Sequence, residues 1–236
     1  MAGYDWSLIP RYFIYFLPAA WMTLKLTTAA IAGGIVLGLI TALMRLSPIW
    51  ILRAPASFYV WVIRGTPLLV QILILYVGMV SLVRLEGFAA AAIAFSVHTG
   101  AYVGEIFRGA ILGVDTGQME AARSLGMTYP KAMRLIILPQ AFRLAVPPLA
   151  NQFIITLKDS SLASVIAIRE LILQARQMGS SQYRMMEFLL IATIYYLIMT
   201  TVLTVLATWM ENRLRRSDQN AGSGKPVVPQ EVEAGD

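Results

Sequence analysis

Residues 19–44 read AAWMTLKLTTAAIAGGIVLGLITALM, a run of apolar and small residues in which Lys25 is the only charge. A helix needs roughly 20 such residues to cross a bilayer, because each adds about 1.5 Å of length and the hydrocarbon core is about 30 Å thick. The run therefore predicts a transmembrane helix. Lys25 is near one end of it, where its side chain can reach the membrane surface.

The rest of the chain has the same apolar character. Of 236 residues, 58% are hydrophobic and only 14% are charged, whereas soluble domains contain about 25% charged residues. Further apolar stretches cover residues 54–83, 88–112, 144–173 and 188–210. Lipid cannot satisfy backbone polar groups, and these stretches lack the alternating pattern of membrane barrels. We predict an all-α polytopic membrane protein with about five transmembrane helices, of which the second and fourth are long enough to kink or tilt.

Basic residues indicate the orientation of these helices, because cytoplasmic loops are enriched in Lys and Arg. Five crossings leave ten basic residues in the loops of one side: Arg45, Arg53, Arg108, Arg123, Lys131, Arg134, Arg143, Arg213, Arg215 and Arg216. The other side receives four: Arg11, Arg84, Arg176 and Arg184. The first side is predicted to be cytoplasmic, which places the N-terminus outside and the C-terminus inside. No basic run is long enough for a nucleic-acid patch.

The two ends differ in composition from the membrane domain, which we place at residues 19–215. Residues 1–18 are rich in aromatic side chains, which favour the membrane interface. They are predicted to form an interfacial segment on the outer side rather than a cleavable signal. Residues 216–236 change to Ser, Asn, Gln, Gly, Pro and acidic residues, a composition that cannot bury a core. We predict that this cytoplasmic tail is disordered.

The longest cytoplasmic connection, residues 113–143, is more elaborate than a linker between two helices needs to be. Residues 119–126 read MEAARSLG, which are good helix formers followed by a glycine, and Gly126 suits a left-handed helix end. Thr128 can cap a second short helix with Pro130 in its first turn. Pro139 is expected to end that helix. Two ordered helices in one loop predict a binding surface for another protein.

Fixed positions in this loop resemble the signature of ABC importer permeases. The signature is Glu-Ala-Ala, three residues, Gly, nine residues and Ile-x-Leu-Pro, and the chain has every position: Glu120, Ala121, Ala122, Gly126, Ile136, Leu138 and Pro139. Flanking stretches are similar to the branch that transports polar amino acids such as histidine, glutamate, glutamine, arginine and cystine. They read RGTPLLVQ at 64–71, AYVGEIFRG at 101–109, PQAFR at 139–143 and KDSSL at 158–162. The resemblance covers residues 19–215.

The resemblance implies the type I ABC importer permease fold and a set of partners. In that family two permease subunits, identical or paralogous, form the pathway across the bacterial inner membrane. A periplasmic binding protein delivers the amino acid, and two cytoplasmic ATPases, docked on the signature loops, drive transport. The chain has no glycine-rich phosphate loop of its own. We therefore expect ATP hydrolysis on a separate chain, and no catalytic residue, metal or cofactor in this one.

Ionisable side chains inside a membrane are costly and usually face a pathway or the bundle interior. His98, Tyr102, Glu105 and Gly109 recur at intervals of four, three and four residues, so they share one face of the third predicted helix. We assign this face to a substrate pathway. For His98 the alternative is a packing histidine that is hydrogen-bonded to a neighbouring helix.

The fourth predicted span carries a second polar group: Asn151, Lys158, Asp159, Ser160 and Ser161. If the helix breaks there, Asp159 or Ser160 can cap a new helix over residues 162–173. The free N–H groups in the first turn of that helix would hold a substrate carboxylate, as in discontinuous transporter helices. The alternative is neutralisation of Lys158 by Asp159 within the bundle, and both can hold together.

Arg64 and four glycines complete the candidates. Arg64 is predicted either to contact substrate or to pack near the kink that Pro67 imposes on the second span. Two pairs of glycines have the four-residue spacing of helices that pack closely in membranes: Gly34 with Gly38, and Gly100 with Gly104. We expect these pairs to serve packing rather than binding.

The sequence therefore favours the permease subunit of an ATP-driven importer of a polar amino acid. An ion-coupled carrier or channel acting without an ATPase is the alternative, but it leaves the elaborate loop unexplained. A membrane-embedded enzyme fits less well, because the chain has no cysteine, a single histidine and no cluster of metal ligands. Only Glu105 and Asp159 could then do acid–base work.

Overall fold

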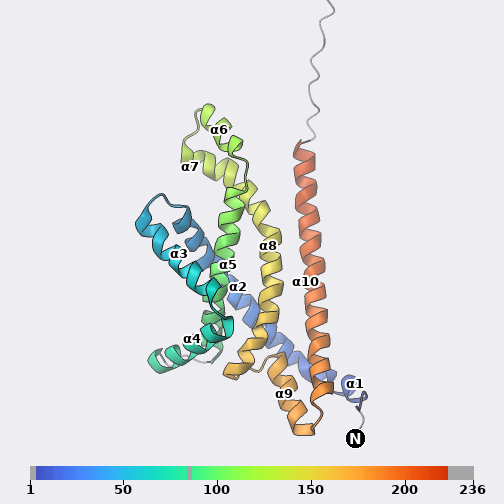
Figure 1. Ribbon diagram of the computed structural model, residues 1–236. Helices are drawn as coiled ribbons and strands as arrows, with labels where there is room; N and C mark the ends of the chain where they lie inside the picture. Colours follow the sequence, from blue (N-terminus) through green and yellow to red (C-terminus); the bar gives the residue numbers. More distant parts are fainter. Residues whose placement is uncertain (1–3, 84–86, 223–236) are drawn as a thin grey trace, which may run out of the picture.

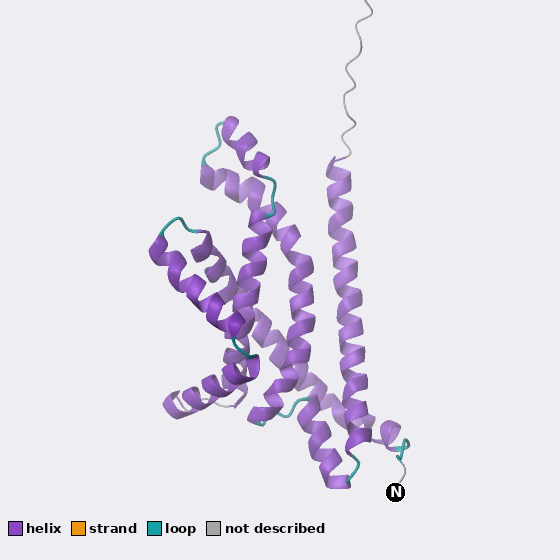
Figure 2. Ribbon diagram, viewed as in Figure 1, coloured by secondary structure: helices purple, strands orange, loops and turns teal. Residues whose placement is uncertain are grey.

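The computed structural model describes residues 4–83 and 87–222, and every regular element in these ranges is a helix (Figure 1, Figure 2). The α-helices are α1 (Leu8–Tyr12), α2 (Leu17–Leu46), α3 (Trp50–Gly65), α4 (Leu68–Val83), α5 (Gly87–Leu112), α6 (Thr116–Ser124), α7 (Tyr129–Ala132), α8 (Leu138–Asp159), α9 (Leu171–Gln182) and α10 (Met185–Gly222). Between them lie two 3₁₀ helices, η1 (Phe13–Phe16) and η3 (Ser160–Ile166), and a π-helical turn, η2 (Met133–Ile137). The predicted all-α class is confirmed.

Three helical stretches in the described ranges are long and apolar enough to cross a membrane: Leu8–Leu46, Gly87–Leu112 and Met185–Leu214. The pair Trp50–Gly65 and Leu68–Gly78, bent by 113° at its break, is apolar enough only when its two helices are taken together, and it counts as a fourth if the pair is one span. The remaining predicted span, residues 144–173, is not one helix. The 22 residues of α8 extend about 33 Å, but Arg143, Lys158 and Asp159 make this helix less apolar than the other spans. The chain then continues through η3 to α9.

Pro67 places the bend between α3 and α4. Thr66 is extended, with φ −122° and ψ 148°, because the residue before a proline avoids the helical region. Gln71 secures the bend, since its Nε2 donates to the carbonyl oxygens of Ile63 at 2.7 Å and of Thr66 at 3.0 Å. The kink expected at Pro67 is confirmed. It is sharp because one helix stops and another starts.

Glycines allow the backbones of α2 and α5 to meet. A Cβ added to Gly38 would lie 2.8 Å from the backbone nitrogen of Gly104, and one added to Gly100 would lie 2.8 Å from the Cβ of Leu37. Gly34 is similarly crowded. These distances are shorter than Cβ contacts in real proteins, so only glycine fits without movement of one helix. The close packing predicted for the two glycine pairs is confirmed.

Replacing Gly38 by alanine should therefore destabilise the helix pair. Overpacking of a tight contact costs about 1–3 kcal/mol, which we expect to see as a lower midpoint of thermal unfolding for the purified protein in detergent. The matched control is Gly78→Ala in α4, where an added Cβ meets no atom within 4 Å, and it should keep the wild-type midpoint. Equal midpoints for the two variants would show that the glycine contact contributes nothing.

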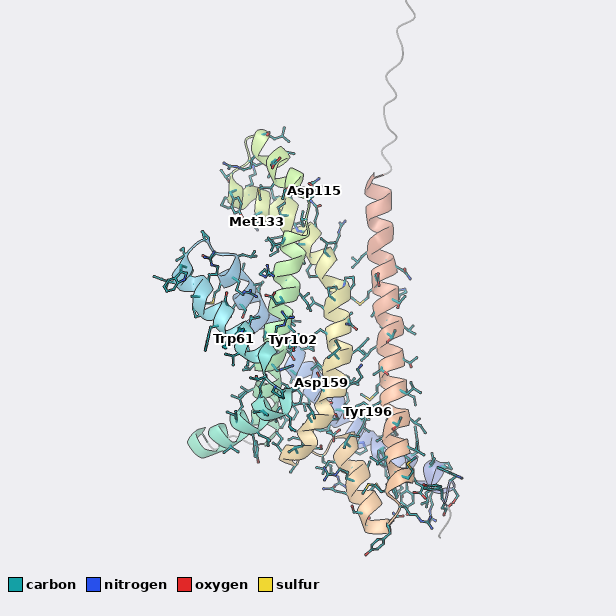
Figure 3. All side chains as sticks on the ribbon, viewed as in Figure 1. Trp61, Tyr102, Asp115, Met133, Asp159 and Tyr196 are labelled. Atoms are coloured by element: carbon teal, nitrogen blue, oxygen red, sulfur yellow. The ribbon has the colours of Figure 1, made fainter. Side chains whose placement is uncertain are left out.

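α8 runs antiparallel to α5, and this fixes the relative depth of their side chains. Near one end of α5, Ala110 belongs to the same core cluster as Ala141 of α8. Toward the other end, Ala94 shares a core cluster with Ala163 of η3. The last turn of α8 therefore lies beside the middle of α5, and in Figure 3 Asp159 lies below Tyr102, nearer the end of the molecule that holds α9.

Part of the aromatic N-terminal segment serves the fold. Phe16 is buried and stacks on Phe188 of α10, and the Phe13 ring lies 4.4 Å from the ring of Tyr195. Other aromatic side chains of the segment are exposed: Tyr4, Trp6 and Tyr15. The interfacial location of residues 1–18 thus stays a prediction, and it rests on the exposed aromatic side chains only.

The predicted tail, residues 216–236, differs from expectation in its first part. α10 runs without a break to Gly222, because residues 216–221 contain neither glycine nor proline to end the helix. Residues 223–236 lie outside the described part of the chain. Disorder stays a prediction for them.

Candidate functional site

The loop that carries the signature projects from one end of the molecule. α6 and α7 lie beyond the adjoining ends of α5 and α8, opposite the end that holds α1 and α9 (Figure 1). Asp115 caps α6, since its side chain accepts the backbone N–H of Gly117 at 2.7 Å. Ala122 is buried, whereas Glu120 and Ala121 are exposed. The loop is therefore an ordered unit with one packed face and one outward face.

The end of α6 has the predicted left-handed glycine. Gly126 has φ +80°. Its N–H donates to the carbonyl of Arg123 at 3.0 Å, and the N–H of Met127 donates to the carbonyl of Ala122 at 3.1 Å. This pair of bonds is the Schellman motif, which needs a left-handed residue after the helix. A Cβ at Gly126 would meet no atom within 4 Å, so backbone conformation and not space requires glycine here.

The second short helix begins as predicted but does not end as predicted. Thr128 is the residue before α7 and Pro130 is in its first turn, although the Thr128 side chain makes no capping bond. α7 then passes through η2 into α8, and Pro139 lies in the first turn of α8. The expectation that Pro139 ends a helix is wrong, because the backbone stays helical through the π-helical turn η2 and the proline comes just after that turn. Ile136 packs on the core beneath the loop, while Leu138 is exposed.

Glu105 is the centre of a charge cluster on α5. Its carboxylate accepts bonds from Arg108 at 3.0 and 3.2 Å, pairs with Arg45, and lies 3.8 Å from Nη1 of Arg64. The Glu105 side chain is 20% exposed and that of Arg64 is 47% exposed. Three cations face one anion, so the cluster has an excess of positive charge. Arg64, which has the longest contact and the most exposed side chain, is the arginine most able to bind another anion.

Two arginines of this cluster, Arg45 and Arg108, are assigned to loops from the sequence. Arg45 lies in the last turn of α2 and Arg108 near the end of α5, and the structure brings both to Glu105. The three-residue spacing of Glu105 and Arg108 is a usable signal, because such pairs face each other on a helix. No local pattern links Glu105 with Arg45, which is 60 residues away along the chain.

His98 connects α5 to the bend between α3 and α4. Its Nδ1 lies 2.9 Å from Oε1 of Gln71. Because Nε2 of the same amide donates to two carbonyls, Oε1 is the acceptor and Nδ1 of His98 is the donor. The Tyr102 ring lies 5.0 Å from His98 and 5.4 Å from the guanidinium of Arg64. His98, Tyr102 and Glu105 thus share a face as predicted, Arg64 joins them, and His98 makes the packing contact that was one of its two alternatives.

The same face of α5 borders an open groove against α8. The groove has a volume of about 410 Å³ and is lined by Glu105, Ile106, Gly109, Ala110, Gly113, Leu144 and Pro148. Asn151 and Lys158 are exposed on α8. Asn151 follows Pro148 by three residues and Lys158 follows Asn151 by seven, so all three lie on the same face of the helix. Of the predicted positions, Glu105 and Gly109 line this groove, and Asn151 and Lys158 lie on the face of α8 that carries Pro148.

The helix break predicted near Asp159 is not formed. The backbone stays helical from α8 into η3, and neither Asp159 nor Ser160 makes a side-chain cap. The backbone N–H of Ser160 is bonded to carbonyls of the preceding turn, so no free helix end is available to a carboxylate. Lys158 is exposed, and it forms no ion pair with Asp159 in the described structure. Ser160 is buried, and Asp159 and Ser161 are partly buried.

The new helix starts later, at Glu170. The Glu170 side chain accepts the N–H groups of Ile172 at 2.9 Å and Leu173 at 2.7 Å, and the hydroxyl of Tyr196 donates to it at 2.8 Å. Glu170 is fully buried, so the chain's own carboxylate occupies this helix end. Glutamate is not among the preferred capping residues, and the sequence gives no sign of this role.

Long apolar helices, an open groove between two of them that contains Glu105, and an ordered loop at one end are typical of a subunit of a membrane transport system. A family model described as "Binding-protein-dependent transport system inner membrane component" matches residues 34–216. The chain belongs to this family. It is thus a multi-pass permease subunit of an ABC importer, a class in which a separate subunit hydrolyses ATP and a substrate-binding protein takes part.

Relatives and solved structures agree with this assignment. The glutamine transport system permease protein of Escherichia coli is 36% identical over 215 residues, which cover 90% of this chain and 98% of the relative. The L-cystine transport system permease protein of Bacillus subtilis is 42% identical over 214 residues, 89% and 92% of the two chains. A crystal structure of an amino acid ABC transporter with histidines superposes with a TM-score of 0.85 at 42% identity, covering 90% of this chain and all of that one. The predicted importer permease fold is confirmed.

Proposed function

We propose that this chain, with a second permease subunit, forms the pathway by which an ATP-driven importer moves a polar amino acid across a bacterial inner membrane. The ordered loop of α6 and α7 carries the proposal, since it holds the complete signature and turns an exposed face away from the rest of the described chain. Relatives named for glutamine and for L-cystine support an amino acid as substrate. The distribution of basic residues favours a cytoplasmic location for this loop and the C-terminus and a periplasmic one for the N-terminus.

The exposed face of the loop suits an ATPase. The loop exposes three large apolar side chains, with Leu125 83% exposed, Tyr129 56% and Leu135 55%. At the cytoplasmic end of the molecule lipid does not cover such side chains, and exposed apolar patches mark interaction sites. An ion-coupled carrier would have no use for this surface. We therefore propose that each of the two permease subunits in the transporter binds one cytoplasmic ATPase.

The groove between α5 and α8 is the proposed substrate pathway. It is open in the single chain, and the second permease, identical or paralogous, would close it. Arg64 would bind the α-carboxylate, because a guanidinium matches a carboxylate in geometry and charge, and it replaces the helix end expected near Asp159. The pathway then comprises the polar residues at this level: Arg64, His98, Tyr102, Glu105, Asn151, Lys158, Asp159, Ser160 and Ser161.

Cysteine crosslinking tests the docking of the loop. The chain has no cysteine, so a single one introduced by Ser124→Cys or Thr128→Cys on the exposed loop should crosslink to a co-expressed ATPase. The matched control is Ser181→Cys, which is exposed at the end of α9 on the opposite side of the molecule. It should react with impermeant thiol reagents from outside intact cells and should not crosslink to the ATPase.

The same strains test the ATP dependence of transport. Vesicles that contain both permeases and the ATPase should accumulate a labelled polar amino acid only when ATP and the binding protein are supplied. Labelling of the Ser124→Cys variant from outside the cell would overturn the orientation. Uptake by the permease alone would overturn the importer assignment in favour of a carrier.

A further inference from the structure

α9 presents a polar, basic face away from the rest of the molecule. Its inner side is buried, through Leu171, Gln174, Ala175 and Gly179. Its outer side exposes Arg176, Gln177, Ser180 and Ser181. Residues 171–186 contain no Asp or Glu, so nothing acidic within the helix offsets its arginine. Lipid-facing helices are apolar on the outside, and the outer side of α9 is not.

Tyr183, directly after α9, has an unusual backbone and no packing role. It is left-handed, with φ 54° and ψ 35°, and its side chain is 95% exposed. Its N–H points to the carbonyl of Ser180 at 3.4 Å, and the N–H of Arg184 donates to the carbonyl of Gly179 at 2.9 Å. This is the Schellman geometry, in which the left-handed position usually belongs to glycine.

α6 and α9 thus end in the same motif with different residues at the left-handed position. α6 uses Gly126, which has no side chain, whereas α9 uses a tyrosine at a position where a bulky residue is strained. Burial of the ring does not offset this strain, because the Tyr183 side chain is almost completely exposed. Residues with strained backbone conformations cluster at functional sites. The ring of Tyr183 is therefore expected to have its contact outside the chain.

We propose that Tyr183 and the basic outer face of α9 form a docking surface for the soluble solute-binding protein, through an acidic patch on that protein. The proposal rests on the proposed function, which places α9 on the outer side, opposite α6 and α7 (Figure 1). Arg176 gives the surface its charge, and Arg184 adds to it while also lying 3.5 Å from Glu187. A second copy of the chain would bring the same two arginines and be repelled. An exposed tyrosine beside arginines has the composition of an interface anchor.

The test measures stimulation of ATP hydrolysis by the liganded binding protein of the same system, with the permease–ATPase complex in nanodiscs. Tyr183→Gly should raise the half-saturating concentration of binding protein about tenfold, as loss of an interface anchor does, and Tyr183→Phe should raise it far less. Basal ATP hydrolysis should not change. The thermal midpoint of Tyr183→Gly should equal or exceed that of wild type, because glycine relieves the backbone strain.

Charge reversal provides the second arm. Arg176→Glu should raise the half-saturating concentration, and the effect should shrink as salt screens the charges. Its control is Arg213→Glu, the same reversal on α10 near the opposite end, which should have no effect. Unchanged half-saturation in both Tyr183→Gly and Arg176→Glu, or a lower thermal midpoint for Tyr183→Gly, would overturn the docking surface. If wild type itself shows no ATP-driven uptake, the proposed function fails, and the surface fails with it.

Discussion

Gly126→Val should lower uptake about tenfold or more while leaving the protein in the membrane. Valine in the left-handed conformation that Gly126 adopts, φ +80°, is strained by roughly 1–2 kcal/mol or more. The chain can escape the strain only by breaking the Schellman bonds and changing the direction in which α6 enters α7. A penalty of this size corresponds to about a five- to thirtyfold loss of the native loop conformation. We expect ATP-driven uptake to fall at least about tenfold in vesicles with wild-type amounts of permease.

Gly126→Asn is the control for this variant, because asparagine adds a side chain but tolerates the left-handed region. It should keep most of the uptake. An added Cβ meets nothing within 4 Å at this position, so a difference between Val and Asn reports the backbone and not a clash. The ATPase should still hydrolyse ATP in the Gly126→Val complex without moving substrate. Normal uptake by this variant would show that the loop transmits no motion through Gly126.

Sequence patterns predicted the parts of the molecule that depend on neighbours along the chain. The glycine pairs of α2 and α5, the left-handed end of α6 and the shared face of His98, Tyr102 and Glu105 all follow from spacing within one helix. Each is fixed by backbone geometry, namely the helical repeat or a positive φ. The structure confirmed these features, and in the glycine pairs the contact between α2 and α5 uses the small surface that the spacing creates.

Other features depend on contacts between distant segments, and no spacing rule predicts them. Arg45 reaches Glu105 only because α2 and α5 cross, and Glu170 caps α9 only because Tyr196 of α10 encloses it. The break expected at Asp159 was wrong for a related reason. A residue with the right chemistry for a cap stays helical when the preceding turn supplies its hydrogen bonds.

Glu105→Gln should be the most damaging single change in the proposed pathway. The neutral amide would leave the guanidinium groups of Arg45, Arg64 and Arg108 close together without their shared anion. Removing one partner of a buried ion pair costs about 3–5 kcal/mol. The side chains here are between 20% and 47% exposed, so solvent screening should reduce the loss to about 1–3 kcal/mol. We expect a lower thermal midpoint and at least about a tenfold loss of uptake.

A second substitution separates charge repulsion from the loss of a substrate ligand. Adding Arg64→Gln to Glu105→Gln removes the most exposed of the three arginines, so the thermal midpoint should recover part of its loss. Uptake should not recover, because Arg64 is the proposed partner of the substrate carboxylate. Glu211→Gln, at an exposed carboxylate on α10, is the matched control and should change neither quantity. Recovery of uptake together with stability would show that Arg64 does not bind substrate and that Glu105 serves only to hold α2, α3 and α5 together. A wild-type thermal midpoint for Glu105→Gln would show that the charge cluster does not contribute to stability.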